Sequence, residues 1–137
     1  MSRLRTACLT VLVALLMVGC ASLAERREFQ QRELAIYQAH AGEPVDQIRS
    51  FRLISWQPVN QDMLLLEARL NRWYLLDIGG PCLGLEFARV VMFDGTMNSL
   101  RSRFDSVIVE GVRCRIERIR PIDYKAARTE IRAIRQR

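Results

Sequence analysis

The stretch MLLLEARLNRWYLLDI, residues 63–78, decides the fold because it predicts two β-strands joined by a tight turn. Met63–Leu70 and Trp73–Ile78 are rich in apolar and β-favouring residues, and the turn residues Asn71-Arg72 lie between them. Asparagine favours turns because its short side chain bonds to nearby backbone and tolerates a left-handed conformation. We therefore expect an antiparallel hairpin here.

Four more segments share this composition and are bounded by turn residues such as Gly79-Gly80-Pro81 and Asp94-Gly95. These further predicted strands are Ser50–Gln57, Arg89–Phe93, Ser106–Glu110 and Arg113–Ile119. The connections are too short for repeated helical crossovers, so the sheet should be mainly antiparallel. Leu83–Ala88 is either a helical turn or an irregular link. The predicted fold class is mainly β (α+β), a small antiparallel sheet or partly closed barrel of about six strands.

A helix is predicted before the strands. Ser22 and Glu25 have the spacing of a capping box, and no Gly or Pro follows until Gly42. The apolar residues of this segment form no clean stripe, so it is either a weakly docked helix or a partly ordered stalk. We assign residues 20–45 to a tether and residues 46–137 to a single β-rich domain.

A second, amphipathic helix is predicted at the C-terminus, where Asp123 can cap a segment from Tyr124 towards Arg135. Apolar residues recur on it at helical spacing, namely Tyr124, Ala127, Ile131 and Ile134. We expect this face to pack on the sheet. The opposite side carries the basic residues Lys125, Arg128, Arg132 and Arg135.

The first 20 residues resemble the lipobox signal of bacterial lipoproteins. Arg3 and Arg5 form a positive n-region, residues 7–18 form an apolar h-region, and Gly19 directly precedes Cys20. The resemblance implies that the signal peptide, residues 1–19, is removed and that Cys20 is acylated on its sulfur and on its new amino group. Three acyl chains would anchor the protein firmly, because each buried methylene contributes about 0.8 kcal/mol.

Two other interpretations of this segment stay open. One is a transmembrane helix, but residues 7–19 would span only about 20 Å as a helix, short of the roughly 30 Å hydrocarbon core. The other is an ordinary secretory signal cut after Ala21 or Ala24. In Gram-negative lipoproteins the residue after the cysteine influences sorting. By that resemblance, Ala21 directs the protein to the periplasmic face of the outer membrane rather than to the inner membrane.

The remaining cysteines follow from this interpretation of the leader. Cys8 leaves with the signal peptide and Cys20 takes the lipid, so Cys82 and Cys114 remain. Two thiols in an oxidising compartment suggest one disulfide. A redox or metal role is the alternative, but Cys-x-x-Cys is absent and His40 is the single histidine. Two thiols and one imidazole do not complete a zinc site without carboxylates. No metal and no cofactor is predicted.

The C-terminal region is strongly basic. Residues 113–137 hold nine basic and three acidic side chains, in a chain with a formal net charge of +6. The basic side of the C-terminal helix is therefore the candidate surface for an anionic partner, such as lipid head groups, an envelope polymer or an acidic protein face. Nucleic acid is not expected as a partner outside the cytoplasm. A solvated helix face is the alternative, because basic residues near a helix C-terminus also complement its dipole.

Motifs for catalysis are missing, since the chain has no Gly-x-Ser-x-Gly, no Walker loop and no dinucleotide fingerprint. We therefore predict that it is not an enzyme. Carboxylates that could still meet in space are Glu67, Asp77, Glu86, Asp94, Asp105 and Glu110. Asp105 follows Arg103-Phe104, and an Arg–Asp turn contact is expected there. Trp73 and Tyr74 must point to opposite faces of a strand, so one of them, beside Arg72, is a candidate exposed ring for a sugar or a partner.

A second resemblance rests on motifs in the body of the chain, namely Trp56, Trp73-Tyr74-Leu75-Leu76, Gly80-Pro81-Cys82, Phe104-Asp105, Cys114-Arg115-Ile116 and Pro121. Over about residues 43–122 the chain is similar to a domain-of-unknown-function family of small Gram-negative envelope proteins. That similarity implies an exported domain with two paired cysteines and no transferable catalytic residue.

Three functions are weighed. The first is a lipid-anchored, non-enzymatic binding or structural module of the cell envelope. The second is a periplasmic inhibitor or small-ligand-binding module, which a deep apolar pocket or a protruding loop at Gly79–Gly84 would favour. The third is a carboxylate-based hydrolase, which needs two acidic groups in one cleft.

Overall fold

The computed structural model describes residues 22–137, so the predicted signal peptide and the predicted lipid site at Cys20 lie outside the described residues. Residues 36–137 form one compact unit, and the preceding residues belong to another. No helix within the described part of the chain is long and apolar enough to cross a membrane.

Residues 22–39 are α-helical, as the capping pattern predicted. Residues 22–28 are all exposed, and Glu28 and Arg32 form an ion pair one turn apart on the helix surface. The final turn is different, because Ile36 and Tyr37 are buried. These two residues belong to the compact unit that holds the sheet.

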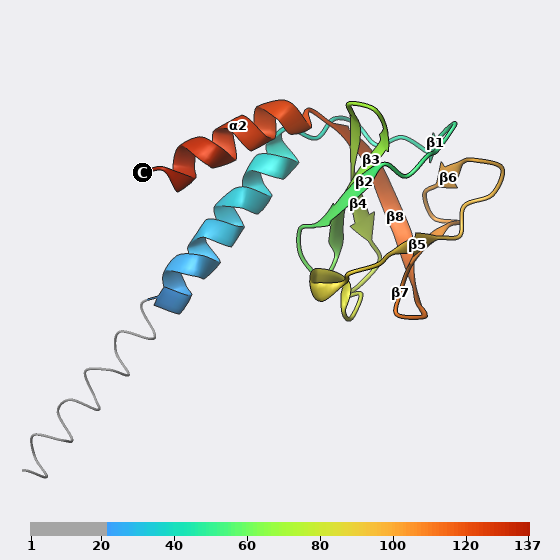
Figure 1. The fold of residues 1–137 in the computed structure, drawn as a ribbon, viewed down its shortest axis with the longest axis horizontal. Coiled ribbons are helices and arrows are strands. Elements are labelled where there is room, and N and C mark those ends of the chain that lie inside the picture. Colours follow the sequence, from blue (N-terminus) through green and yellow to red (C-terminus); the bar gives the residue numbers. More distant parts are fainter. Residues whose placement is uncertain (1–21) are drawn as a thin grey trace, which may run out of the picture. The chain divides into compact units, whose positions relative to one another are not determined.

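The compact unit is built on a six-stranded antiparallel sheet with the order β2-β3-β4-β8-β7-β5 (Figure 1). Its strands are β2 (Ser55–Pro58), β3 (Met63–Arg69), β4 (Arg72–Ile78), β5 (Met92–Phe93), β7 (Ser106–Val109) and β8 (Val112–Ile122). A separate two-stranded sheet pairs β1 (Gln47–Ile48) with β6 (Leu100–Arg101). The 3-10 turn η1 (Leu85–Phe87) follows β4, and α2 (Tyr124–Arg135) follows β8.

The sheet curls around its longest strand, β8, because different parts of this strand pair with different neighbours. Its first residues pair with β7, and its later residues pair with β4 past a bulge between Asp77 and Ile78. The ring of Phe51, in the segment before β2, meets the ring of Phe93 on the edge strand β5 edge to face, with their centroids 5.4 Å apart. The sheet is a half-barrel, and the chain is mainly β with an N-terminal and a C-terminal helix, which confirms the predicted fold class.

The core fills the inside of this half-barrel. Leu64, Leu66 and Leu76 point inwards and are completely buried, as the alternation of β3 and β4 dictates. Leu65 and Leu75 face each other across the same two strands on the opposite side of the sheet, yet they are also fully buried. The outer face of the central hairpin is therefore covered as well.

Cys82 and Cys114 lie in the core, and their sulfur atoms are 1.97 Å apart, the distance of a disulfide. Cys114 is on the inner side of β8, as its alternation predicted. The pair joins the segment after β4 to the first residues of β8, which pair with β7. The same segment is held by backbone bonds, because the Gly79 amide donates to Arg115 and the Cys82 amide donates to Gln61, both at 2.8 Å.

Several predicted boundaries differ from the structure. The predicted strand Ser50–Gln57 is regular only from Ser55, because Ser50 has a left-handed backbone with φ of 53° and the segment after it bonds irregularly to β3. The predicted Arg89–Phe93 is reduced to β5. Conversely, β8 continues past Ile119 through Pro121, which has no amide proton but whose carbonyl accepts the Gly42 amide at 2.7 Å. The strands β1 and β6 were not predicted, since two-residue pairings leave no periodic pattern.

Candidate functional site

The C-terminal helix begins and ends where its sequence predicted. The Asp123 side chain caps it by accepting the Ala126 amide at 3.0 Å. Ala127 and Ile131, on the predicted apolar face, are buried. The helix therefore has one buried side and one side that is open to solvent.

The first turn of α2 contacts the outer face of the sheet through an aromatic stack. The rings of Tyr124 and Trp73 lie nearly parallel with centroids 3.9 Å apart, and the Tyr124 hydroxyl donates to Gln57 at 3.3 Å. The guanidinium of Arg128 lies over the Tyr124 ring, 5.8 Å from its centre. Trp73, Tyr124 and Arg128 thus form a continuous contact from β4 to the exposed side of α2.

His40, which precedes the first strand, also contacts α2 and its cap residue Asp123. The His40 ring pairs with Glu130 at 2.8 Å, and the His40 carbonyl accepts the Asp123 amide at 3.2 Å. The His40 side chain is only 27% exposed and is engaged by α2. A lone histidine carries no sequence signal of such a partner.

An open groove of about 1060 Å³ lies between the start of β4 and α2. We call it the cationic groove. Four basic side chains line it, namely Arg72, Lys125, Arg128 and Arg132. Its other charged or titratable lining residues are Glu67, Asp123, Tyr74, Tyr124 and His40, and Trp73 is part of the lining as well.

The basic side chains of the groove are poorly neutralised by the protein itself. Among residues 22–137, the side chains of Arg72, Lys125 and Arg132 have no hydrogen-bond or ion-pair partner. The acidic lining residues are already used, because Glu67 accepts the Asn71 amide at 2.9 Å and Asp123 caps α2. The groove therefore has a surplus of positive charge that faces solvent.

Three of the four basic residues predicted on the C-terminal helix line the cationic groove. Lys125, Arg128 and Arg132 line the groove, whereas Arg135 in the last turn does not. Arg72 was noted only as the neighbour of an aromatic pair, and its place opposite α2 was missed. That place depends on the contact between Trp73 and Tyr124, which are far apart in the sequence.

The aromatic prediction is corrected by the same contact. Trp73 and Tyr74 do point to opposite faces, but both are half-buried. Tyr74 packs against the core, and one face of Trp73 is occupied by Tyr124. An exposed ring that offers a free face to a sugar is therefore not found at either position.

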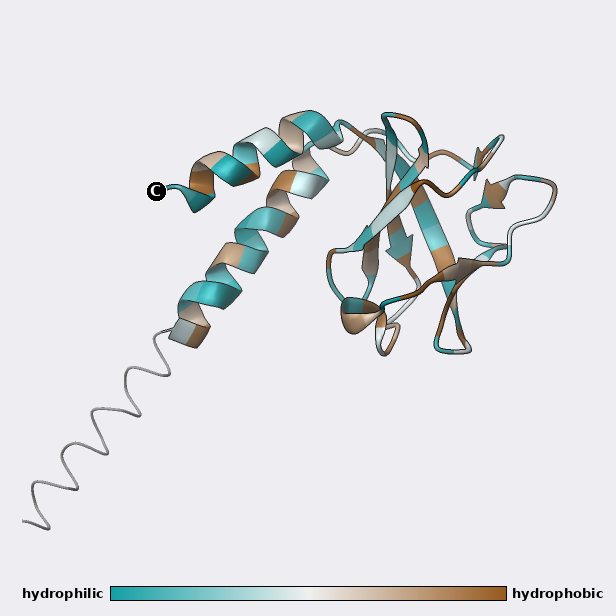
Figure 2. Ribbon diagram, in the orientation of Figure 1, coloured by the Kyte–Doolittle hydropathy of each residue, from teal (hydrophilic) through white to brown (hydrophobic). Residues whose placement is uncertain are grey.

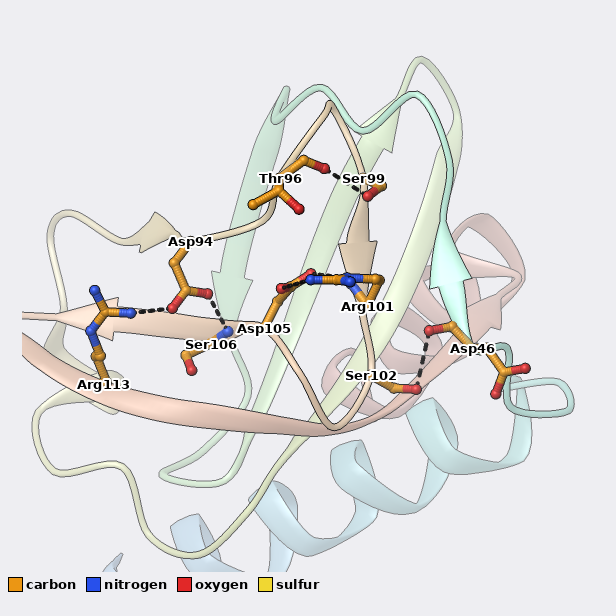
Figure 3. Close-up of polar contacts among 9 residues, drawn as sticks. All are labelled: Asp46, Asp94, Thr96, Ser99, Arg101, Ser102, Asp105, Ser106 and Arg113. Atoms are coloured by element: carbon orange, nitrogen blue, oxygen red, sulfur yellow. Dashed lines mark hydrogen bonds and ion pairs between the residues drawn. The ribbon is translucent and has the colours of Figure 1, made fainter.

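Four of the predicted carboxylates, Glu67, Asp77, Asp94 and Asp105, are held in separate polar contacts, several of which are drawn in Figure 3. Glu86 and Glu110 are exposed and have no such contact among the described residues. Asp94 accepts the Ser106 amide at 2.5 Å and pairs with Arg113. Asp105 accepts the Arg101 amide at 2.7 Å and pairs with its guanidinium at 3.2 Å. The hydrogen bond from the Arg101 guanidinium to Asp105 raises the pKa of Arg101, and the negative charge of Asp105 adds to the effect.

The expected Arg–Asp contact thus forms, but Arg101 and not Arg103 makes it. Arg103 instead lies 3.8 Å from Asp46, and both of these side chains are largely exposed. Asp77 on β4 is buried between Arg118 and Arg120 of β8, each at 2.9 Å. Within the part of the chain that the structure describes, no group of three His, Cys, Asp or Glu residues could hold a metal ion.

No curated protein and no solved structure matches this sequence. A family of unknown function, DUF6491, matches residues 3–137. Since that match covers nearly the whole chain, the protein belongs to the family of unknown function DUF6491.

Proposed function

We propose that this chain is a lipid-anchored protein of the cell envelope that acts by binding, and that the cationic groove is its binding site for an anionic envelope component. The observation that carries this proposal is the set of unpaired basic side chains on the two walls of one groove. Unpaired cations cost little in water, but they attract anions when several of them converge on one concave surface.

The proposed anchor is Cys20, exposed by removal of residues 1–19. The lipobox-like pattern of a positive n-region, an apolar h-region and Gly19 directly before Cys20 supports it. The proposed location is the periplasmic face of the outer membrane. Support comes from Ala21 after the lipidated cysteine and from Cys82 and Cys114, because a disulfide is stable in an oxidising compartment.

A non-enzymatic role is supported by four of the six carboxylates that could have met in space. Asp77, Asp94 and Asp105 are each neutralised by their own arginines. Glu67, the carboxylate of the groove, is engaged by a backbone amide. Carboxylates held in this way stabilise the fold, whereas general acid–base catalysis needs a group that is free to exchange protons with a substrate.

The groove is tested by charge removal with a matched control. The full chain is purified in a non-ionic detergent, and its binding to soluble polyphosphate is measured by titration calorimetry at low and at physiological salt, because a triacylated Cys20 would insert into any vesicle whatever the groove does. The variant Arg72→Gln/Arg128→Gln/Arg132→Gln should lose most binding, and the wild-type protein should lose binding as salt rises. A control variant, Arg49→Gln/Arg52→Gln/Arg89→Gln, removes the same charge outside the groove.

Equal binding of the two variants at low salt would show that only net charge matters. It would contradict the proposal that the cationic groove is the binding site. The anchor needs a separate measurement, which is mass spectrometry of the native protein. The proposal expects a mature chain that starts at Cys20 and carries three acyl chains. An intact leader or an unmodified Cys20 thiol would contradict it.

A second function, an inhibitor of an envelope enzyme, is favoured by one observation. The loop after β4 is fixed by two backbone bonds and by the Cys82–Cys114 contact, and it presents Leu83 with 74% of its surface exposed. A rigid loop with an exposed apolar side chain suits insertion into a pocket of another protein. If envelope proteases are inhibited by the full chain, Leu83→Arg should abolish inhibition and the groove variant should retain it.

A further inference from the structure

We infer that the cationic groove binds one ligand that carries at least two separated phosphate groups, which bridge Arg72 on β4 to Arg128 and Arg132 on α2. This inference rests on the proposed function and specifies its ligand. The four basic residues come from two elements that lie on opposite walls of the groove.

The spacing of the cations requires more than one anionic group. Lys125, Arg128 and Arg132 follow one another at i, i+3 and i+7 on α2. At 1.5 Å per residue, they are spread over about 10 Å along the helix axis. A single phosphate, whose charge-assisted hydrogen bonds are about 2.7–2.9 Å long, cannot reach both ends of this row and the opposite wall.

The chemistry of the side chains favours phosphate. Three of the four basic residues are arginines, whose planar fork of donors matches two oxygens of a phosphate group. Arg128 is oriented before any ligand arrives, because its guanidinium rests on the Tyr124 ring. An arginine held in this way loses less side-chain freedom when it binds.

The two walls are connected beneath the ligand position by the aromatic stack. Trp73 is the residue after Arg72 in β4, and Tyr124 is the residue before Lys125 in α2. A ligand that contacts both walls therefore reinforces a contact that the protein already makes. The two acidic lining residues, Glu67 and Asp123, are tied to backbone amides and reduce the positive potential without cancelling it.

The experiment compares ligands with one and with several phosphates on the full chain in non-ionic detergent. The soluble probes are inorganic phosphate and inositol hexakisphosphate, measured by titration calorimetry. The lipid-headgroup probes are the water-soluble deacylated headgroups of phosphatidylglycerol, which has one phosphate, and of cardiolipin, which has two linked phosphates, because a triacylated Cys20 would insert into any vesicle. We expect the multi-phosphate probe of each pair to bind at least tenfold more tightly.

Variants test the bridge. Arg72→Gln and Arg132→Gln should each weaken inositol hexakisphosphate binding about tenfold, and the double variant should lose clearly less than the product of the two losses, because one ligand uses both residues. Arg89→Gln, away from the groove, should have no effect. Arg128→Lys keeps the charge but not the fork, so its loss should be measurable yet smaller than that of Arg128→Gln.

The outcomes separate this inference from the function on which it rests. The inference of a bridging ligand is wrong if mono- and multi-phosphate probes bind equally, or if Arg72→Gln has no effect while Arg132→Gln does. In either case the proposal that the groove binds anions is not contradicted. Tighter binding of poly-glutamate than of either multi-phosphate probe would overturn the phosphate assignment. If no anionic probe binds at low salt, the proposed function itself fails. Binding to the cardiolipin headgroup but not to inositol hexakisphosphate supports a lipid source, and binding to both supports phosphate from either source.

Discussion

The basic C-terminal region divides into two parts that use arginine for opposite purposes. On β8, Arg113 pairs with Asp94, and Arg118 and Arg120 enclose Asp77. On α2, Lys125 and Arg132 have no such partner among the described residues. The comparison shows that a basic stretch of sequence is not one surface. Arg113, Arg118 and Arg120 on the strand hold the sheet together, whereas Lys125 and Arg132 on the helix remain available to a ligand.

The surroundings of the two ends of β8 also differ. Its last residue leads into α2 and the cationic groove, whereas its first residue, Val112, lies in a hairpin beside η1, where Gly84 approaches Val109. Exposed apolar residues lie in or next to η1, β5 and the β7–β8 hairpin, and they are Leu83, Phe87, Val90, Met92 and Val112. Figure 2 colours the ribbon by the hydropathy of each residue. Charge and apolar surface thus mark different ends of the same strand.

The largest effect is expected where β8 uses arginine structurally. In Asp77→Ala, Arg120, whose side chain is only 15% exposed, loses its buried partner. Removing one member of a buried ion pair typically costs 3–5 kcal/mol, so we expect a loss of about 3 kcal/mol in the free energy of unfolding, measured in urea. A loss below about 1 kcal/mol would show that the ion pair on β8 is as weak as a surface pair.

A similar loss is expected where Cys114 fastens the other half of β8. Cys82 and Cys114 are 32 positions apart, and closing such a loop stabilises a fold by about 3–4 kcal/mol in the chain-entropy model. Cys82→Ser and Cys114→Ser should therefore lower the urea midpoint equally under oxidising conditions, and the double variant should be no worse than either. Additive losses would mean that the two cysteines do not share a bond.

A smaller effect is expected at the junction between the two parts. Tyr124→Leu removes the stack on Trp73, and aromatic pairs contribute about 0.5–1.5 kcal/mol beyond their buried area. We expect a loss of about 1 kcal/mol in the free energy of unfolding, together with weaker anion binding because Arg128 loses its support. Tyr124→Phe keeps the ring and should retain the binding. Unchanged binding in Tyr124→Leu would show that the stack does not organise the groove.

The smallest effect is expected on α2. Arg132 lies in the last turn, where a cation complements the helix dipole by about 0.3–1 kcal/mol, and repulsion from Arg128 one turn away opposes this by about 0.2–0.5 kcal/mol. Because the two contributions largely cancel, Arg132→Gln should change the thermal midpoint little at low salt, while it weakens binding. If this variant were destabilised as strongly as Asp77→Ala, the contrast between β8 and α2 would disappear.

Sequence patterns predicted the parts of the fold that depend on neighbours along the chain. The hairpin of β3 and β4, the inward position of Cys114 and the cap of α2 at Asp123 follow from alternation and from local hydrogen bonds. The short strands β1 and β6 and the extension of β8 through Pro121 were missed, because their partners lie far away in the chain. For the groove, the cations of α2 were predicted and Arg72 was not.

By itself, therefore, the sequence determined the two helices, the main strands β3, β4, β7 and β8, and which face of α2 is basic, since these depend on side-chain periodicity over a few residues. Only the tertiary structure decided which cations are neutralised. The antiparallel register of β4 against β8 places Asp77 directly opposite Arg118, and the contact of Tyr124 with Trp73 places Arg72 across from α2. These pairings join segments that no local pattern connects, and they depend on how the whole chain packs around its core.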